Sequence, residues 1–184
     1  MKLPGKELDL HFKKTVTQWD EAIPLGNGVS GALLWGNPRG FRFSLDRTDI
    51  WELTPNPRIY EEDFTYEKMI ELVKEKNEKE IRERFSDIYN YVLPTKLPAG
   101  KLIFDFGCDD NVVSDLSLAK AEAKITIGEK VRLRSFLHAT KKVGMIHIDQ
   151  PAADFSYYID NPDFGVEGID APETGEVNSV NTAS

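Results

Sequence analysis

Three carboxylates and a tryptophan lie close together near the end of the first third of the chain: Asp46, Asp49, Trp51 and Glu52. A pair of carboxylates on either side of a glycosidic bond can hydrolyse it, provided that one of them has a raised pKa and serves as the acid. Asp46 falls at the end of an expected strand, however, and Asp49 in the turn after it, where Asp commonly caps turns. We therefore expect structural roles for these carboxylates, and the spacing alone assigns no catalytic residue.

A binding role is the functional alternative for the same region. Carboxylates accept hydrogen bonds from hydroxyl groups, and an aromatic ring offers an apolar face to the C–H groups of a carbohydrate. In an antiparallel pair, the start of one strand lies beside the end of its neighbour. We therefore expect Asn27, Asp46, Asp49 and Trp51 to gather at one end of a sheet, with Trp19 packed against the glycine-rich loop there. The competing interpretation is that Trp51 is a core residue.

A glycine-rich segment follows Pro24 and contains Gly26, Gly28 and Gly31 around Asn27. Two glycines around one asparagine before a strand predict that Gly26 or Gly28 has a positive φ. The segment is no phosphate-binding loop, because neither GxxxxGK[ST] nor GxGxxG is present. The structural interpretation is an antiparallel strand pair with a glycine-rich entry loop and no chemistry.

Histidine and cysteine give only weak signals for metal or redox chemistry. His138 and His147 fall in two late strands separated by a turn, where they could be cross-strand neighbours and bind a metal together with an acid. Two histidines without a third ligand are a weak pattern, so we predict no metal and no cofactor. Cys108 is the single cysteine, which excludes an internal disulfide, and Asp109 and Asp110 beside it favour a structural thiol.

The composition is that of an ordinary globular protein, with 184 residues, 40% hydrophobic and 29% charged. The net charge of −8 argues against binding to nucleic acid, which requires clustered Lys and Arg. No apolar run is long enough for a membrane helix, and the first residues lack the apolar core of a signal peptide. Localisation stays open, because a secreted or periplasmic parent protein with a signal outside this sequence would look the same.

Alternation of apolar and polar residues predicts a mainly β, antiparallel sandwich. Residues 64–92 are the exception, since their apolar residues repeat with a helical period, and Asn77 followed by Glu80 indicates a second helix start. We expect these two helices to pack on one face of the sheet through Ile70, Val73, Ile81, Phe85 and Ile88. The predicted domain covers residues 1–160, and residues 161–184 form a loop or frayed tail. The expected strands are 8–12, 29–35, 41–45, 102–106, 121–127, 131–137, 143–148 and 155–159.

The region from Trp19 to Trp51 resembles the start of the N-terminal domain of glycoside hydrolase family 95, the α-L-fucosidase-type enzymes. That family's pattern is roughly W…LPxGNGxxGAxxxG, followed by xLNEDTLWxG. The residues in register are Trp19, Pro24, Gly26, Asn27, Gly28, Gly31, Ala32, Gly36, Leu45 and Trp51. Weaker matches to the family's later motifs continue in order as far as Ile159. The sequence departs from the family pattern at Asp46 and Arg47, where the family usually has Asn and Glu.

The resemblance implies a β-sandwich of the super-sandwich type that is noncatalytic alone and supports a separate C-terminal (α/α)6 barrel absent from this sequence. The barrel would hydrolyse α-L-fucosides or related galactosides with inversion and without a cofactor, and Asn27, Asp49 and Trp51 would face it. Two alternatives stay open. One is a free-standing carbohydrate-binding or interaction module without catalysis. The other is the sandwich domain of a family 65-like phosphorylase, because unrelated activities share such folds.

Overall fold

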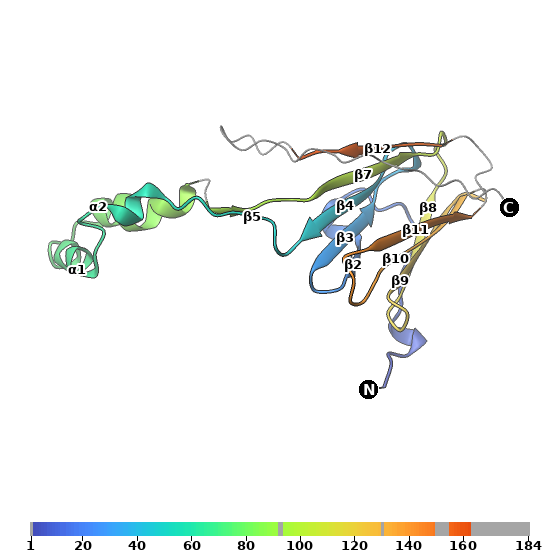
Figure 1. The fold of residues 1–184 in the computed structure, drawn as a ribbon, viewed down its shortest axis with the longest axis horizontal. Helices are drawn as coiled ribbons and strands as arrows, with labels where there is room; N and C mark the ends of the chain where they lie inside the picture. The colour runs from blue at the N-terminus through green and yellow to red at the C-terminus, as the bar shows by residue number, and fades with distance from the viewer. Residues whose placement is uncertain (1, 92–93, 130, 150–154, 163–184) are drawn as a thin grey trace. The chain divides into compact units, whose positions relative to one another are not determined.

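The structure is a computed structural model that describes residues 2–91, 94–129, 131–149 and 155–162. The described chain forms two compact units, which are presented separately below (Figure 1). The first unit contains the residues up to Asp49 and those from Pro98 onward, and the second contains Ile50–Leu97. The predicted two-helix insertion thus coincides with the second unit.

The first unit consists of two five-stranded antiparallel sheets (Figure 1). Sheet 1 has the order β1 (Leu10–Phe12), β8 (Val112–Ser117), β9 (Glu122–Ile127), β10 (Val131–Leu137) and β11 (Gly144–Asp149). Sheet 2 has the order β12 (Ser156–Asp160), β7 (Gly100–Asp105), β4 (Phe41–Arg47), β3 (Ser30–Trp35) and β2 (Ile23–Gly26). Three 3-10 turns complete the unit: η1 (Lys6–Leu8), η2 (Trp19–Glu21) and η3 (Pro38–Gly40).

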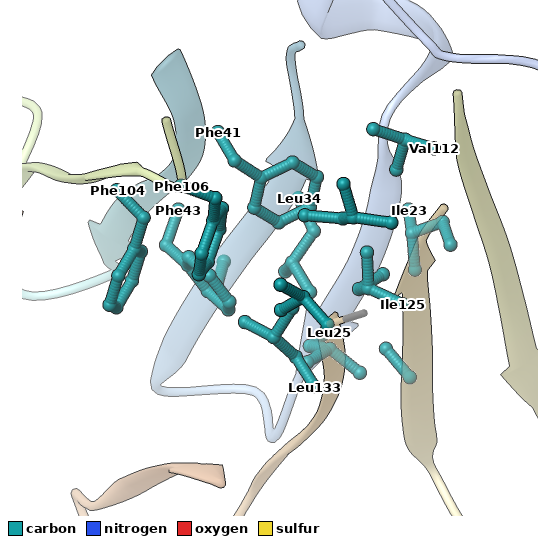
Figure 2. Packing of buried hydrophobic residues seen from close by; sticks show 14 of the residues in the cluster. Ile23, Leu25, Leu34, Phe41, Phe43, Phe104, Phe106, Val112, Ile125 and Leu133 are labelled. Atoms are coloured by element: carbon teal, nitrogen blue, oxygen red, sulfur yellow. The ribbon is translucent and has the colours of Figure 1, made fainter. Parts of the chain in front are cut away.

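The core lies between the two sheets and is built from alternate residues of each strand (Figure 2). In β4, Phe41 and Phe43 are almost fully buried, and their rings meet edge to face with centroids 5.8 Å apart. Sheet 1 contributes Ile125 and Leu133, which are 1% exposed. Burial of side chains of this size supplies about 1.5–3 kcal/mol each. The predicted antiparallel sandwich is therefore confirmed.

Strand β3 is apolar over most of its length but is buried on one face only. Only Ala32 and Leu34 are buried, whereas Leu33 and Trp35 point to the opposite face and are half-buried. Trp35 is held there by two contacts: its Nε1 donates to the hydroxyl of Ser44 at 3.0 Å, and the Arg42 guanidinium lies 4.8 Å from the ring centroid. Because the indole N–H of Trp35 has a polar partner, this side chain can lie on a face of β3 that is partly exposed to solvent.

The predicted hairpin over residues 121–137 is confirmed as β9 and β10, with Gly128 at a φ of 55° in the turn. The first predicted strand corresponds to β1, which pairs with β8 at the margin of sheet 1. On β1, the Nδ1 atom of His11 lies 2.6 Å from the Asp115 carboxylate.

The second unit begins and ends in a short ribbon in which β5 (Trp51–Glu52) pairs with β6 (Thr95–Lys96). Side-chain caps begin both helices, and the cap at Asn77 is the predicted one. Thr65 accepts a hydrogen bond from the Lys68 amide at 3.1 Å, and Asn77 accepts one from the Glu80 amide at 3.2 Å. Between the ribbon strands lie η4 (Pro57–Tyr60), α1 (Tyr66–Lys74), α2 (Glu78–Ile81), the π-helical turn η5 (Arg82–Ser86) and η6 (Asp87–Asn90).

The predicted apolar stripe of the helices needs one correction. Leu72 is the buried residue of α1, at 1% exposure, whereas Val73 is 53% exposed. Ile70, Ile81 and Phe85 are half-buried, and the Phe85 ring lies 5.2 Å from that of Phe64. Helix α1 is therefore rotated by about one residue relative to the expected stripe. Packing of this insertion on a sheet face stays a prediction.

Two predictions concern parts of the chain outside the described residues. These are the side chain of Ile88 and the tail at 161–184, of which the structure describes residues 161 and 162 alone. Within the described ranges, no helix is both long enough and apolar enough to span a membrane.

Candidate functional site at the loop end of the sandwich

Three segments that are distant in sequence meet at one end of the first unit, which we call the loop end. They are the β2–β3 turn with Asn27, the end of β4 from Asp46 to Asp49, and the turn after β10 that begins at His138. Strand register places Gly26 opposite Gly31, and Gly31 opposite Asp46. The predicted proximity of Asn27 to the end of β4 follows directly from this pairing.

The side chain of Asn27 connects the two sheets. Its Oδ1 accepts hydrogen bonds from the amides of Val29 and Ser30, at 3.0 and 2.8 Å. Its Nδ2 donates to the carbonyls of His138 and Lys141, at 2.8 and 3.2 Å. Two donors and two acceptor positions are the full capacity of a carboxamide. These contacts make Asn27 a structural clamp and leave little capacity for a ligand.

The turn held by Asn27 is also stabilised from within. The Nδ1 atom of His138 accepts from the amides of Thr140 and Lys141, at 3.2 and 3.1 Å. His147 lies opposite Arg134 and contacts the Asp149 carboxylate at 2.5 Å, so His138 and His147 are not cross-strand neighbours. In the part of the chain that the structure describes, no group of three His, Cys, Asp or Glu side chains could hold a metal ion.

Asp49 is fixed by a two-pronged ion pair with Arg47. The distances are 2.9 Å from Nε to Oδ1 and 2.6 Å from Nη2 to Oδ2, and the Lys142 ammonium lies 3.6 Å from Oδ2. The hydrogen bonds from Arg47 lower the pKa of Asp49 from 3.8 to about 2. Hydrogen bonds from the hydroxyl and amide of Thr54 likewise lower the pKa of Glu52. Both side chains are therefore carboxylates at neutral pH, the opposite of what a general acid requires.

A hollow of about 220 Å³ opens at the loop end, bordered by the glycine-rich turn and by Asp46, Arg47 and Thr48. Gly28 has a φ of 86°, which confirms the predicted positive φ. Gly26 and Gly31 have no such requirement, and a Cβ there would meet its nearest atoms at ordinary distances of 3.8 and 3.7 Å. Glycines that the local backbone does not require mark places where a ligand or another backbone approaches closely.

Trp19 and Trp51, the tryptophans of the predicted site, belong to different parts of the chain. Trp19 is in η2 before the start of β2, whereas Asn27 follows the end of β2, so the expected packing of Trp19 on the glycine-rich loop is wrong. The Trp19 side chain is 64% exposed. Trp51 belongs to the second unit, where it lies opposite Lys96 and is 51% exposed. Its approach to the loop end stays a prediction.

The fold and the family comparison define the class of this chain. Residues 10–175 match the family described as "Glycosyl hydrolase family 65, N-terminal domain", and the chain belongs to that family. It is also similar to alpha-L-fucosidase 2 of Arabidopsis thaliana, with 29% identity over 163 residues. This alignment covers 86% of the chain and 17% of the plant protein, so the chain spans less than a fifth of that relative.

Proposed function

We propose that this chain is the noncatalytic N-terminal sandwich domain of a family 95-type glycoside hydrolase that cleaves α-L-fucosides or related galactosides. The observation that carries the proposal is the extent of the match to alpha-L-fucosidase 2, which takes up most of this chain but only 17% of that relative. A segment of that size fits one domain of a larger enzyme. A separate (α/α)6 barrel would carry the acid and base.

The electrostatics of the loop end support a noncatalytic role. Arg47 keeps the pKa of Asp49 well below its usual range, and Asn27 is engaged by main-chain groups of both sheets. What the loop end offers is a hollow bordered by Gly26, which is exposed, and Gly31, which is half-buried. We infer that the barrel docks there, with Asp46 and Asp49 at the rim of the contact and Trp51 beside it.

The decisive experiment uses the full-length product of the gene that encodes these residues, with nitrophenyl α-L-fucoside and the α-galactoside as substrates. We expect hydrolysis that does not depend on phosphate. In that protein, Trp51→Ala should lower activity more than it lowers thermal stability. A full-length protein that hydrolyses neither glycoside would contradict the proposal.

The name of the matched family favours one second candidate, the sandwich domain of a family 65-like phosphorylase. The two candidates differ in the nucleophile, which is water in a hydrolase and phosphate in a phosphorylase. Phosphate-dependent cleavage of α-glucosyl disaccharides by the full-length protein, with formation of a sugar phosphate, would select the phosphorylase.

A further inference from the structure

The second unit contains a cavity of about 470 Å³ in which charged and amide side chains surround a tyrosine. Its volume falls in the range of small-molecule sites, about 300–1,000 Å³. It lies between η4 and the segment from η5 to the residue after η6. The lining residues used below are Asn56, Arg58, Glu83, Asp87, Asn90 and Tyr91.

Two hydrogen bonds organise the η4 side of the cavity, one at the start of η4 and one from η4 to the helical segment. Asn56 is only 5% exposed, and its Oδ1 accepts from the amide of Arg58 at 3.0 Å, which starts η4. The Arg58 guanidinium then donates from Nη1 to the main-chain carbonyl of Glu83. Glu83 belongs to the π-helical turn η5, a rare geometry that occurs frequently at functional sites.

The lining also carries groups that suit hydroxyl ligands. Asn90 donates to the Asp87 carboxylate at 3.4 Å, and Tyr91 presents a ring that is 48% exposed. Amide and carboxylate groups are planar and hold donors and acceptors at fixed positions, as the hydroxyls of a sugar ring require. The tyrosine ring adds an apolar face and a hydroxyl.

The charges of the cavity narrow the class of ligand. The lining includes one arginine and two carboxylates, a net negative charge that disfavours phosphate and other anions, and an apolar ligand would leave these charges without water. Glu83 and Asp87 alone do not make a metal site, and no cluster of three ligands occurs among the described residues. A neutral molecule with many hydroxyl groups fits best.

We propose that this cavity binds one or two residues of a carbohydrate. The choice of sugar rests on the proposed function. Tyr91 stacks on the C–H face of the ring, while Asp87, Asn90 and Arg58 bind its hydroxyls. The subsite would give the domain a direct part in recognising an extended substrate.

The test is a titration of the isotopically labelled 184-residue chain with L-fucose, D-galactose and D-glucose, followed by NMR. We expect saturable shifts at the amides of Asp87, Asn90 and Tyr91. Tyr91→Leu and, separately, Asp87→Asn should each weaken binding about tenfold or more. Tyr60→Leu is the matched control, because Tyr60 is in the same unit, is 72% exposed and does not line the cavity. The amide spectrum of the second unit reports folding of each variant.

Three results would overturn the assignment: no saturable shift with any of the sugars, an equal loss in Tyr60→Leu, or shifts confined to the loop end. A full-length enzyme that cleaves α-L-fucosides while the chain binds no sugar would remove this subsite and leave the proposed function intact. Sugar binding at Tyr91 in a protein without glycosidase activity would contradict the proposed function and support the subsite.

Discussion

Asn27 and His138 are hydrogen-bonded across the sandwich, with 2.8 Å between the side-chain Nδ2 of the first and the main-chain carbonyl of the second. The bond joins the β2–β3 turn of sheet 2 to the turn after β10 of sheet 1. The asparagine of the glycine-asparagine-glycine motif therefore fixes the loop end by joining the two sheets.

Replacement of Asn27 by Asp should destabilise the sandwich. The carboxylate retains the acceptors for Val29 and Ser30 but places a negative charge against two carbonyls that had a donor. We expect a loss of about 1–3 kcal/mol in the free energy of unfolding, measured with urea. Asn37→Asp is the control, because Asn37 is exposed and its side chain makes no capping hydrogen bond. Equal effects of the two changes would contradict the clamp.

The glycines of the motif should separate into two classes. Gly28→Ala should lower stability by about 1 kcal/mol, because its φ of 86° is strained for alanine even though nothing lies within 4 Å of the added Cβ. Gly31→Ala should be neutral or stabilising by up to about 1 kcal/mol. Denaturant midpoints measure both effects.

A larger substitution at Gly31 tests the docking surface in the full-length enzyme. Gly31→Leu fills the hollow and should reduce activity without lowering the midpoint of the isolated domain. If Gly31→Leu left the activity of the full-length enzyme unchanged, the hollow would not be the contact with the barrel.

The Arg47–Asp49 pair should make stability depend on pH in the acid range. The folded-state pKa of about 2 is below the ordinary 3.8, so the contribution of the pair is complete above about pH 4 and is lost as the pH falls toward 2. The stability difference between the wild type and Asp49→Asn should shrink over that interval. An NMR titration of the Asp49 carboxyl should give a midpoint near 2, and Arg47→Gln should raise it. A midpoint that Arg47→Gln leaves unchanged would exclude the proposed cause.

Neighbouring positions in α1 should respond very differently to truncation. Leu72→Ala removes a side chain that is 1% exposed and should cost about 2–5 kcal/mol, whereas Val73→Ala at 53% exposure should change stability by less than about 0.5 kcal/mol. Hydrogen exchange of the α1 amides measures the stability of this unit itself. A larger loss of stability in Val73→Ala than in Leu72→Ala would contradict the observed packing and favour the apolar stripe predicted from the sequence.

Much of the fold could be predicted from alternation, because strands such as β4 keep apolar Phe41 and Phe43 on one face. Strand β2 was missed because Pro24 and Gly26 resemble a loop, although an edge strand tolerates proline where no amide is needed. Strand β8 was missed because the inward-facing Ser114, at 6% exposure, breaks its apolar alternation.

The site was less predictable than the fold, since it depends on contacts between sheets. Register within sheet 2 places Asn27 near Asp46, and that much follows from antiparallel pairing. The partner of Asn27 lies 111 residues away in sheet 1, and no local pattern of residues reports such a contact. Trp19 was misplaced for the same reason: aromatic type indicates burial or binding but not the end of the strand at which a side chain lies.

The most direct test of the central claim is a comparison of the purified 184-residue chain with the full-length enzyme on nitrophenyl α-L-fucoside. The account predicts turnover by the full-length protein and none by the chain, because its loop-end carboxylates are structural and the acid and base belong to the barrel. Turnover by the isolated chain that survives purification and disappears in Asp46→Asn or Asp49→Asn would contradict the account and make the loop end an active site.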